Sequence, residues 1–153
     1  MKSERKHIYE HYGQNLLNTG EGYRCFCSKK RLHDLARHQS ILGHQQSYDR
    51  TCAEIPKDQS DEWAAEGKPH VIRLKVPGNG YPSFKDETFG VIKARHAISS
   101  TGVFDDPIMI KSDGMPTYHF ANVVDDHLMK ITHVIRGSVC GQNLLFGQLL
   151  IVL

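Results

Sequence analysis

Several features that would assign this chain to a class at once are missing from its 153 residues. No apolar run approaches the roughly 18 residues that span a bilayer. The start, Met1 to His7, has no apolar core of the kind that marks a secretory signal. Four cysteines are too few for a disulfide scaffold, so we expect a reducing compartment. The composition therefore argues against a membrane protein and against a small secreted one.

Strong charge bias and the common nucleotide motifs are absent as well. Nineteen Lys and Arg against seventeen Asp and Glu leave a net charge of +2, which excludes a polybasic or acidic tail as the main feature. The chain has no G-x-S-x-G, no G-x-x-x-x-G-K and no G-x-G-x-x-G, so no self-contained nucleotide site is visible. What is present is 39% hydrophobic and 24% charged residues, which is typical of a globular chain.

An apolar stripe near the start predicts a helix over residues 4–18. Ser3 is the expected N-cap, and Gly20 is the expected breaker after the last turn. The stripe repeats at four-residue steps through Ile8, Tyr12 and Leu16. We therefore expect this helix to pack one face on a core.

A second helix is predicted over residues 28–42, with Ser28 as its N-cap and Gly43 at its end. The residues expected to face inward are Leu32, Leu35, Ala36, Ile41 and Leu42. The opposite face carries Lys29, Lys30, Arg31, Arg37 and His38. From composition alone this basic face is either a solvated helix surface or a nucleic-acid contact.

The rest of the chain is predicted to contain two more helices and several short strands. We expect a helix over 117–129 and a short one that ends at Ala65. Alternation in His70–Val76 predicts a half-exposed strand, with Arg73 and Lys75 on its polar side. Further strands are predicted at 23–27, 82–85, 89–93 and 107–111, and a buried one at 131–135. This order suggests a β-rich insert within an α/β chain.

Three cysteines and one tyrosine have a spacing that allows a metal site. Cys25 and Cys27 form a C-x-C pair, and Cys52 follows later with Tyr48 before it. Zinc takes about four nitrogen, sulfur or oxygen ligands in a tetrahedron. The spacing differs from the usual finger, so the alternative is that these cysteines are ordinary reduced residues of a strand. Cys140 stands alone in an apolar tail, where we expect it to be inert.

Two carboxylate pairs, Asp105-Asp106 and Asp125-Asp126, are further candidates for a metal or for acid–base chemistry. Adjacent residues on a helix do not point the same way, so neither pair is a site by position alone. We expect turn or capping roles for Asp105 and Asp106.

The most specific stretch is residues 108–136, which read IMIKSDGMPTYHFANVVDDHLMKITHVIR. It resembles the glutamyl-tRNA synthetases, class I aminoacyl-tRNA synthetases of the bacterial and organellar type. The resemblance covers residues 3–137, and the Cys-Phe-Cys at 25–27 is similar to mitochondrial members. Other matching pieces, in the same order, are Ser3-Glu4-Arg5, Ile8-Tyr9, residues 23–28, Tyr48-Asp49 and residues 73–77.

This resemblance implies an α/β fold: a Rossmann-like nucleotide-binding catalytic domain, built on a parallel sheet and interrupted by an inserted α+β domain that binds the tRNA acceptor stem. Residues 1–19 would end the first half of the catalytic domain, and 20–106 would be the insert. Residues 107–137 would begin the second half, and 138–153 form a divergent apolar tail. The implied location is mitochondrial, with the cytoplasm as the alternative.

The resemblance also implies site residues and partners. Tyr118, Asn122 and Arg136 occupy the positions that line the family's glutamate pocket, and Tyr118 and Asn122 share one helix face by their spacing. ATP, L-glutamate and tRNA would be the partners. The expected tRNA contacts are Lys29, Lys30, Arg31 and Arg37. The expected zinc ligands of some members are Cys25, Cys27, Tyr48 and Cys52, with Glu54 where a member can have a histidine.

The chain also departs from the family. Both ATP signature motifs of the family fall outside residues 1–153, and Val139 stands where the family has an acidic residue that contacts ATP. We therefore interpret the chain as an incomplete catalytic domain without independent activity. The alternatives are a tRNA-binding module, with or without zinc, and an unstable product of a truncated gene model. Whether the parent uses tRNA for glutamate alone or also for glutamine is left open.

Overall fold

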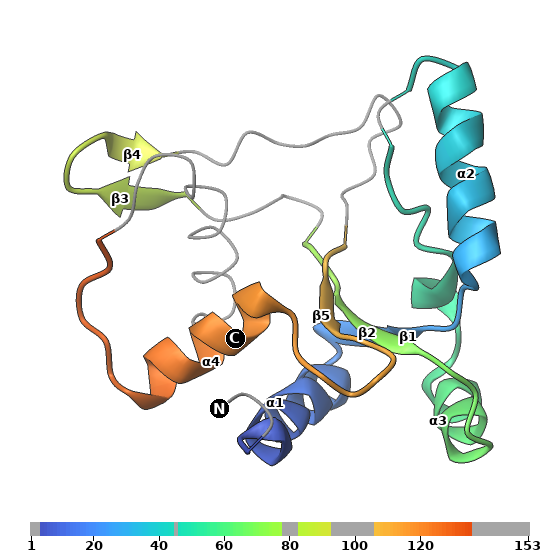
Figure 1. Cartoon of the computed structure of the whole chain (residues 1–153), viewed down its shortest axis with the longest axis horizontal. Helices are drawn as coiled ribbons and strands as arrows, with labels where there is room; N and C mark the ends of the chain where they lie inside the picture. Colours follow the sequence, from blue (N-terminus) through green and yellow to red (C-terminus); the bar gives the residue numbers. More distant parts are fainter. Residues whose placement is uncertain (1–3, 45, 78–82, 93–105, 136–153) are drawn as a thin grey trace.

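The structure is a computed structural model that describes residues 4–44, 46–77, 83–92 and 106–135. A three-stranded sheet lies at its centre, with helices around it and a separate hairpin to one side (Figure 1). In chain order the elements are α1 (Lys6–Thr19), β1 (Gly22–Cys25), α2 (Lys29–Ile41), the 3-10 helix η1 (Thr51–Glu54), α3 (Lys57–Ala65), β2 (Val71–Leu74), β3 (Phe84–Asp86), β4 (Gly90–Ile92), β5 (Ile108–Ile110) and α4 (Tyr118–Leu128).

The central sheet has the order β1-β2-β5, and both of its strand pairs are antiparallel. We expected a parallel sheet, and that prediction is wrong for the strands that the structure describes. β3 and β4 form a separate antiparallel hairpin, in which Asp86 pairs with Gly90. β5 lies in the same sheet as β1 and β2, so residues from 108 onward continue the sheet that begins at Gly22.

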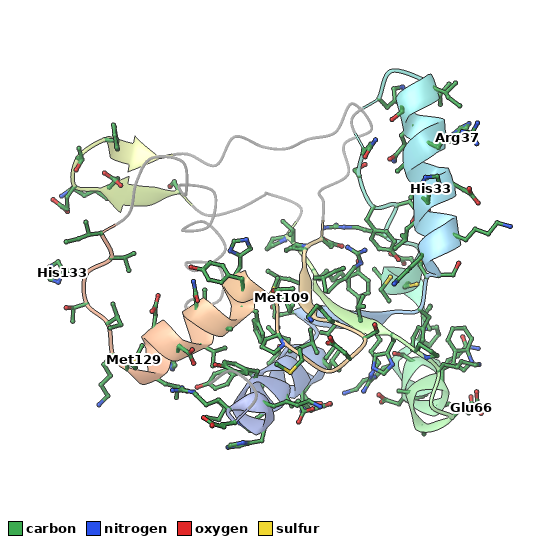
Figure 2. The ribbon with its side chains drawn as sticks, in the orientation of Figure 1. His33, Arg37, Glu66, Met109, Met129 and His133 are labelled. Carbon is green, nitrogen blue, oxygen red and sulfur yellow. The ribbon has the colours of Figure 1, made fainter. Side chains whose placement is uncertain are left out.

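One face of the sheet carries the main hydrophobic core. α1 and α4 pack against each other and against β5 on this face. Met109, which is 1% exposed, lies at the centre of the molecule between α4 and the sheet (Figure 2). The two helices cover the apolar side chains of β5 on this face. The core residues are Tyr9, Leu16, Leu74, Met109, Ile110, Phe120, Ala121 and Val124.

Helix α1 approaches the sheet closely because Gly13 faces it. A Cβ at Gly13 would lie 3.0 Å from Cγ1 of Ile110 and 3.4 Å from Cδ1 of Ile72. The Tyr9 hydroxyl donates to the Asp125 carboxylate at 3.0 Å, and Arg5 forms an ion pair with the same group at 3.0 Å. These contacts join α1 to α4. They also show that Asp125 has a structural role.

The helix ends agree in part with the sequence. Gly20 ends α1 at φ +80, as expected, but the N-cap is Arg5, without a side-chain cap, and Ser3 lies outside the described residues. Ser28 caps α2 by accepting a hydrogen bond from the Arg31 amide at 3.2 Å. The prediction for the inner face of α2 is wrong at its end: Ile41 is 73% and Leu42 54% exposed. No residue of α2 is buried, because this helix stands at the side of the sheet (Figure 1).

The prediction of a buried strand at 131–135 is also wrong. These residues form no strand, and Ile135 is 98% exposed. Their apolar side chains have no adjacent strand to pair with among the residues that the structure describes. The other predicted strands and helices are confirmed within a few residues at each end.

The second face of the sheet is covered by the segment that contains Tyr48 and Cys52, which pack with Cys25 and Val71. Both faces of β2 are therefore buried. Ile72 and Leu74 point to the α1 side, and Val71 and Arg73 point to the cysteine side. This explains why the expected exposure of Arg73 is wrong: the side chain is at the polar position of the strand, but only 6% exposed.

Asp106 is the most extensively bonded buried group. It is fully buried, and its carboxylate accepts hydrogen bonds from the Tyr23 hydroxyl at 2.8 Å and the Val76 amide at 3.0 Å. Arg50 forms an ion pair with it at 2.5 Å. This is a buried ionic role, so the prediction of a turn or capping role for Asp106 is wrong. Its neighbour Asp105 lies outside the described residues.

We predict that Asp106→Ala lowers the free energy of unfolding by about 3 kcal/mol, because it leaves the Arg50 guanidinium without its buried partner. Asp61→Ala removes a surface ion pair with Arg24 and should lower it by less than about 1 kcal/mol. Urea denaturation followed by circular dichroism compares the two. Equal decreases in the free energy of unfolding in both variants would contradict the structural importance of Asp106.

Candidate functional site

The structure brings together the four residues that the sequence marked as possible metal ligands. Cys25 is the last residue of β1, and Cys27 follows in the turn before α2. Cys52 lies in η1, and Tyr48 lies in the loop that precedes it. The three sulfur atoms are within 4.8 Å of one another, and all three thiols are free.

The distances within this cluster suit a tetrahedral site. The Tyr48 hydroxyl oxygen is 3.3 Å from Sγ of Cys25 and 3.4 Å from Sγ of Cys27. Sγ of Cys27 and Sγ of Cys52 are 3.5 Å apart. Around zinc, with Zn–S bonds of about 2.3 Å and Zn–O bonds of about 2.0 Å, two sulfurs would lie roughly 3.8 Å apart and a sulfur and an oxygen roughly 3.5 Å apart. The donor set of soft thiolates also suits this metal.

The environment of the cluster raises the pKa values of Tyr48 and Cys52 and lowers that of Cys25. Burial, and hydrogen bonds with the cysteines, raise the pKa of Tyr48. The hydrogen bond with Cys25, followed by burial, raises the pKa of Cys52. The hydrogen bond with Cys52 lowers the pKa of Cys25. A thiolate is the form that binds metal, so the lowered pKa of Cys25 favours its use as a ligand.

Two arginines flank the cluster. Nη1 of Arg31 donates to Sγ of Cys27 at 3.2 Å, and the same side chain pairs with Asp49 at 2.6 Å. The guanidinium carbon of Arg73 lies 4.1 Å from the centre of the Tyr48 ring. Glu54, at the position where some family members have a histidine, is exposed and is not part of the group of possible ligands among the described residues.

The residues expected to contact tRNA separate into two sets. Lys29, Lys30 and Arg37 are exposed on α2, and Arg37 projects away from the sheet (Figure 2). Arg31 instead turns toward the cysteine cluster, where it also donates to Thr51 at 2.8 Å. Of the four residues expected to contact tRNA, Lys29, Lys30 and Arg37 are therefore exposed to solvent.

Two of the three residues expected to line a glutamate pocket lie on α4. Tyr118 is its first residue and is 58% exposed, and Asn122 lies one turn later and is half-buried. Their side chains belong to the same face of the helix. Arg136 lies outside the described residues, as do Val139, Cys140 and the rest of the tail.

Comparison with known proteins identifies the family. The family model for the catalytic domain of class I tRNA synthetases (E and Q) matches residues 1–142. The chain belongs to this family. It is 49% identical over 138 residues to the glutamate–tRNA ligase of Clostridium tetani, a match that covers 90% of this chain and 27% of that protein. The ligase of Psychrobacter sp. is 46% identical over 137 residues.

Solved structures of glutamate–tRNA ligases have the same fold. The ligase of Elizabethkingia meningosepticum, crystallised in complex with its amino acid, matches 97% of this chain with a TM-score of 0.81 and 32% identity. The matched region is 30% of that structure. The chain therefore spans about a quarter to a third of the length of the relatives that it matches. It has the mixed α/β fold of a class I catalytic domain, which confirms the predicted fold class.

Among the described residues, no helix is long and apolar enough to cross a bilayer.

The residue near the site that the sequence did not predict is Arg73, which was assigned to the polar side of its strand. Only the loop around Tyr48, which comes from more than twenty positions earlier in the chain, buries that side of the strand. Asp49, the partner of Arg31, was likewise noted only as part of the family resemblance.

Proposed function

We propose that this synthetase segment serves glutamate–tRNA ligation, the ATP-dependent attachment of glutamate to tRNA. The identity of 49% over 138 residues to a glutamate–tRNA ligase carries this proposal. The placement of Tyr118 and Asn122 on one face of α4 supports it, because the family lines its amino-acid pocket with residues at these positions. No catalytic residue is assigned within the chain.

The chemistry proceeds in two steps. The glutamate α-carboxylate attacks the α-phosphorus of ATP, which forms glutamyl adenylate and releases pyrophosphate. The terminal ribose hydroxyl of tRNA then attacks the acyl carbon and releases AMP. In this scheme Tyr118, Asn122 and Arg136 hold glutamate, and the planar fork of Arg136 suits bidentate pairing with a carboxylate.

A chimeric enzyme tests the proposal. The 138 residues of this chain that align with the C. tetani ligase would replace the matching quarter of that enzyme. We expect glutamate-dependent ATP–pyrophosphate exchange in the chimera and none in residues 1–153 alone. Arg136→Ala in the chimera should raise the KM for glutamate at least about tenfold, since one hydrogen bond to a charged group contributes roughly 1.5–3 kcal/mol.

The KM for ATP is the internal control of that experiment, and it should change less than about threefold. Equal increases for glutamate and ATP would assign Arg136 a structural role. An inactive but folded chimera would count against the proposed function, and exchange by residues 1–153 alone would overturn their interpretation as an incomplete domain.

We further propose that α2 contacts the tRNA acceptor stem, which is the second candidate function and can operate without catalysis. The observation that favours it is a helix with no buried residue whose outer face carries Lys29, Lys30 and Arg37. Such cations bind phosphates, and binding of this kind weakens steeply with salt. α2 and α4 lie on opposite sides of the central sheet in Figure 1, which fits separate sites for the tRNA and the amino acid.

Replacement of Lys29, Lys30 and Arg37 by Gln should remove the cations that pair with up to three phosphates. We expect the slope of log affinity for a tRNA acceptor hairpin against log salt to fall in magnitude by about 0.7 to 0.9 for each phosphate that is no longer neutralised. Fluorescence anisotropy from 50 to 300 mM KCl measures it. Lys68→Gln, just after α3, is the matched control, and an equal decrease in that variant would contradict a site on α2.

We propose that the cluster of Cys25, Cys27, Tyr48 and Cys52 holds a structural zinc ion. The four donor atoms suit a closed tetrahedral site, and zinc would cross-link β1 to η1 when bound. ATP would be the co-substrate of the proposed ligase activity.

Metal analysis of the untagged chain should give close to one zinc per chain, and Cys25→Ser should reduce it to less than about a fifth of that. Cys140→Ser is the matched control and should keep the wild-type content. Less than a few tenths of an equivalent in the wild type would refute the site. Retention of zinc in Cys25→Ser would show that the ligand set is wrong.

The type and location of the parent enzyme follow from the same resemblance. We propose a bacterial or mitochondrial type, with a mitochondrial location in a eukaryote and the cytoplasm as the alternative. The support is the Cys25-Phe26-Cys27 sequence together with the similarity to bacterial ligases. Immunofluorescence with an antibody to this chain distinguishes the two locations.

A further inference from the structure

Arg73 is a buried cation that pairs with no carboxylate among the residues that the structure describes. Its side chain lies on the cysteine side of β2 and is 6% exposed. Nη1 donates to the backbone carbonyl of Asp106 at 2.6 Å, and Nε has no hydrogen-bond partner in the structure. The carboxylate of Asp106 pairs with Arg50 instead. Within the described residues, no ion pair includes Arg73.

A buried guanidinium in such a position is costly unless an anion lies close to it. The nearest candidates on this face are the side chains of the cysteine cluster. The guanidinium carbon lies 4.1 Å from the centre of the Tyr48 ring. Arg73 therefore contacts the member of the cluster that supplies its oxygen ligand.

The other arginine at the cluster is different. Arg31 donates to Cys27, but Asp49 already balances its charge through two contacts, at 2.6 and 3.4 Å. Arg31 is also partly exposed to solvent. The charge of Arg31 is therefore shared between Asp49 and the cluster. Among the residues that the structure describes, Arg73 is the cation at the cluster that has no carboxylate partner.

We propose that Arg73 is the counter-charge of the metal centre: a positioning residue that stabilises the anionic ligand set of Cys25, Cys27, Tyr48 and Cys52. This inference rests on the proposed zinc site. Three thiolates and one phenolate around a divalent ion have a formal charge of roughly −2 by addition, and a neighbouring cation offsets the cost of burying that charge. The cation–π contact also keeps the Tyr48 ring turned so that its oxygen points to the sulfurs.

The test measures zinc affinity in the full 153-residue chain by competition with a chromophoric chelator. Arg73→Gln should weaken zinc binding by roughly 10- to 100-fold, the range found when a partner of a metal ligand is removed. Arg73→Lys keeps the charge and should stay within about fivefold of the wild type. Arg24→Gln on the neighbouring strand, whose partner is the surface residue Asp61, is the matched control and should bind as the wild type does.

A double-mutant cycle with Tyr48→Phe tests whether the effect passes through the phenolate. Arg73→Gln should weaken binding much less in the Tyr48→Phe background than in the wild type, because the anion that it balances is gone. Cobalt substitution adds an independent readout, since the visible d–d and thiolate charge-transfer bands report a tetrahedral thiolate site. In Arg73→Gln these bands should keep their position and appear only at higher cobalt concentration.

The possible results separate the metal site from the role of Arg73. A wild type that binds no zinc refutes the proposed metal site and this inference with it. Zinc binding by Arg73→Gln within about threefold of the wild type, or equal decreases in Arg73→Gln and Arg73→Lys, overturns only the role of Arg73. If Arg73→Gln does not fold in excess zinc, the zinc affinity of Arg73→Lys is the deciding measurement. An affinity within about fivefold of the wild type supports the counter-charge role of Arg73, and a larger decrease overturns it.

Discussion

The carboxylate of Asp106 holds together parts of the chain that are distant in sequence. It accepts hydrogen bonds from Tyr23 on β1 and from the Val76 amide after β2, and it pairs with Arg50 beside η1. Its own carbonyl accepts from Arg73. Because the group is fully buried, each of these donors is needed to offset its desolvation. The position of the loop that carries Tyr48 and Cys52 depends on this network, since Arg50 lies between those two residues.

The two faces of the sheet have different roles. The face under α1 and α4 is apolar and positions α4, whose first residue is Tyr118. The opposite face gathers sulfur, phenol and guanidinium groups around Cys25. A thin sheet of three strands thus separates the helix with the expected amino-acid contacts from the cluster with the expected metal. A zinc ion on the second face would add a cross-link between β1 and η1.

Much of the local structure could be predicted because it depends on neighbouring residues. Ser28 caps α2 and Gly20 ends α1, since capping and a left-handed backbone involve only adjacent positions. The spacing of Cys25, Cys27, Tyr48 and Cys52 allowed a metal site but also an ordinary strand, and the family resemblance gave the four residues as a ligand set. The failures concern long-range contacts: residues 131–135 have the pattern of a strand, but a strand requires a partner.

The sequence by itself determined the family, the extent of most helices and strands, and the identity of the candidate ligands, because these follow from composition, periodicity and a long specific match. Only the tertiary structure decided how charged side chains are used. Arg31 and Arg73 occupy positions that read as solvent-exposed, yet the fold turns both toward one cluster of sulfurs. Asp106 reads as a turn residue and is the buried centre of a polar network. The physical reason is that the free energy of a charged side chain depends on the residues that bury and pair with it, and these residues are far away in the sequence.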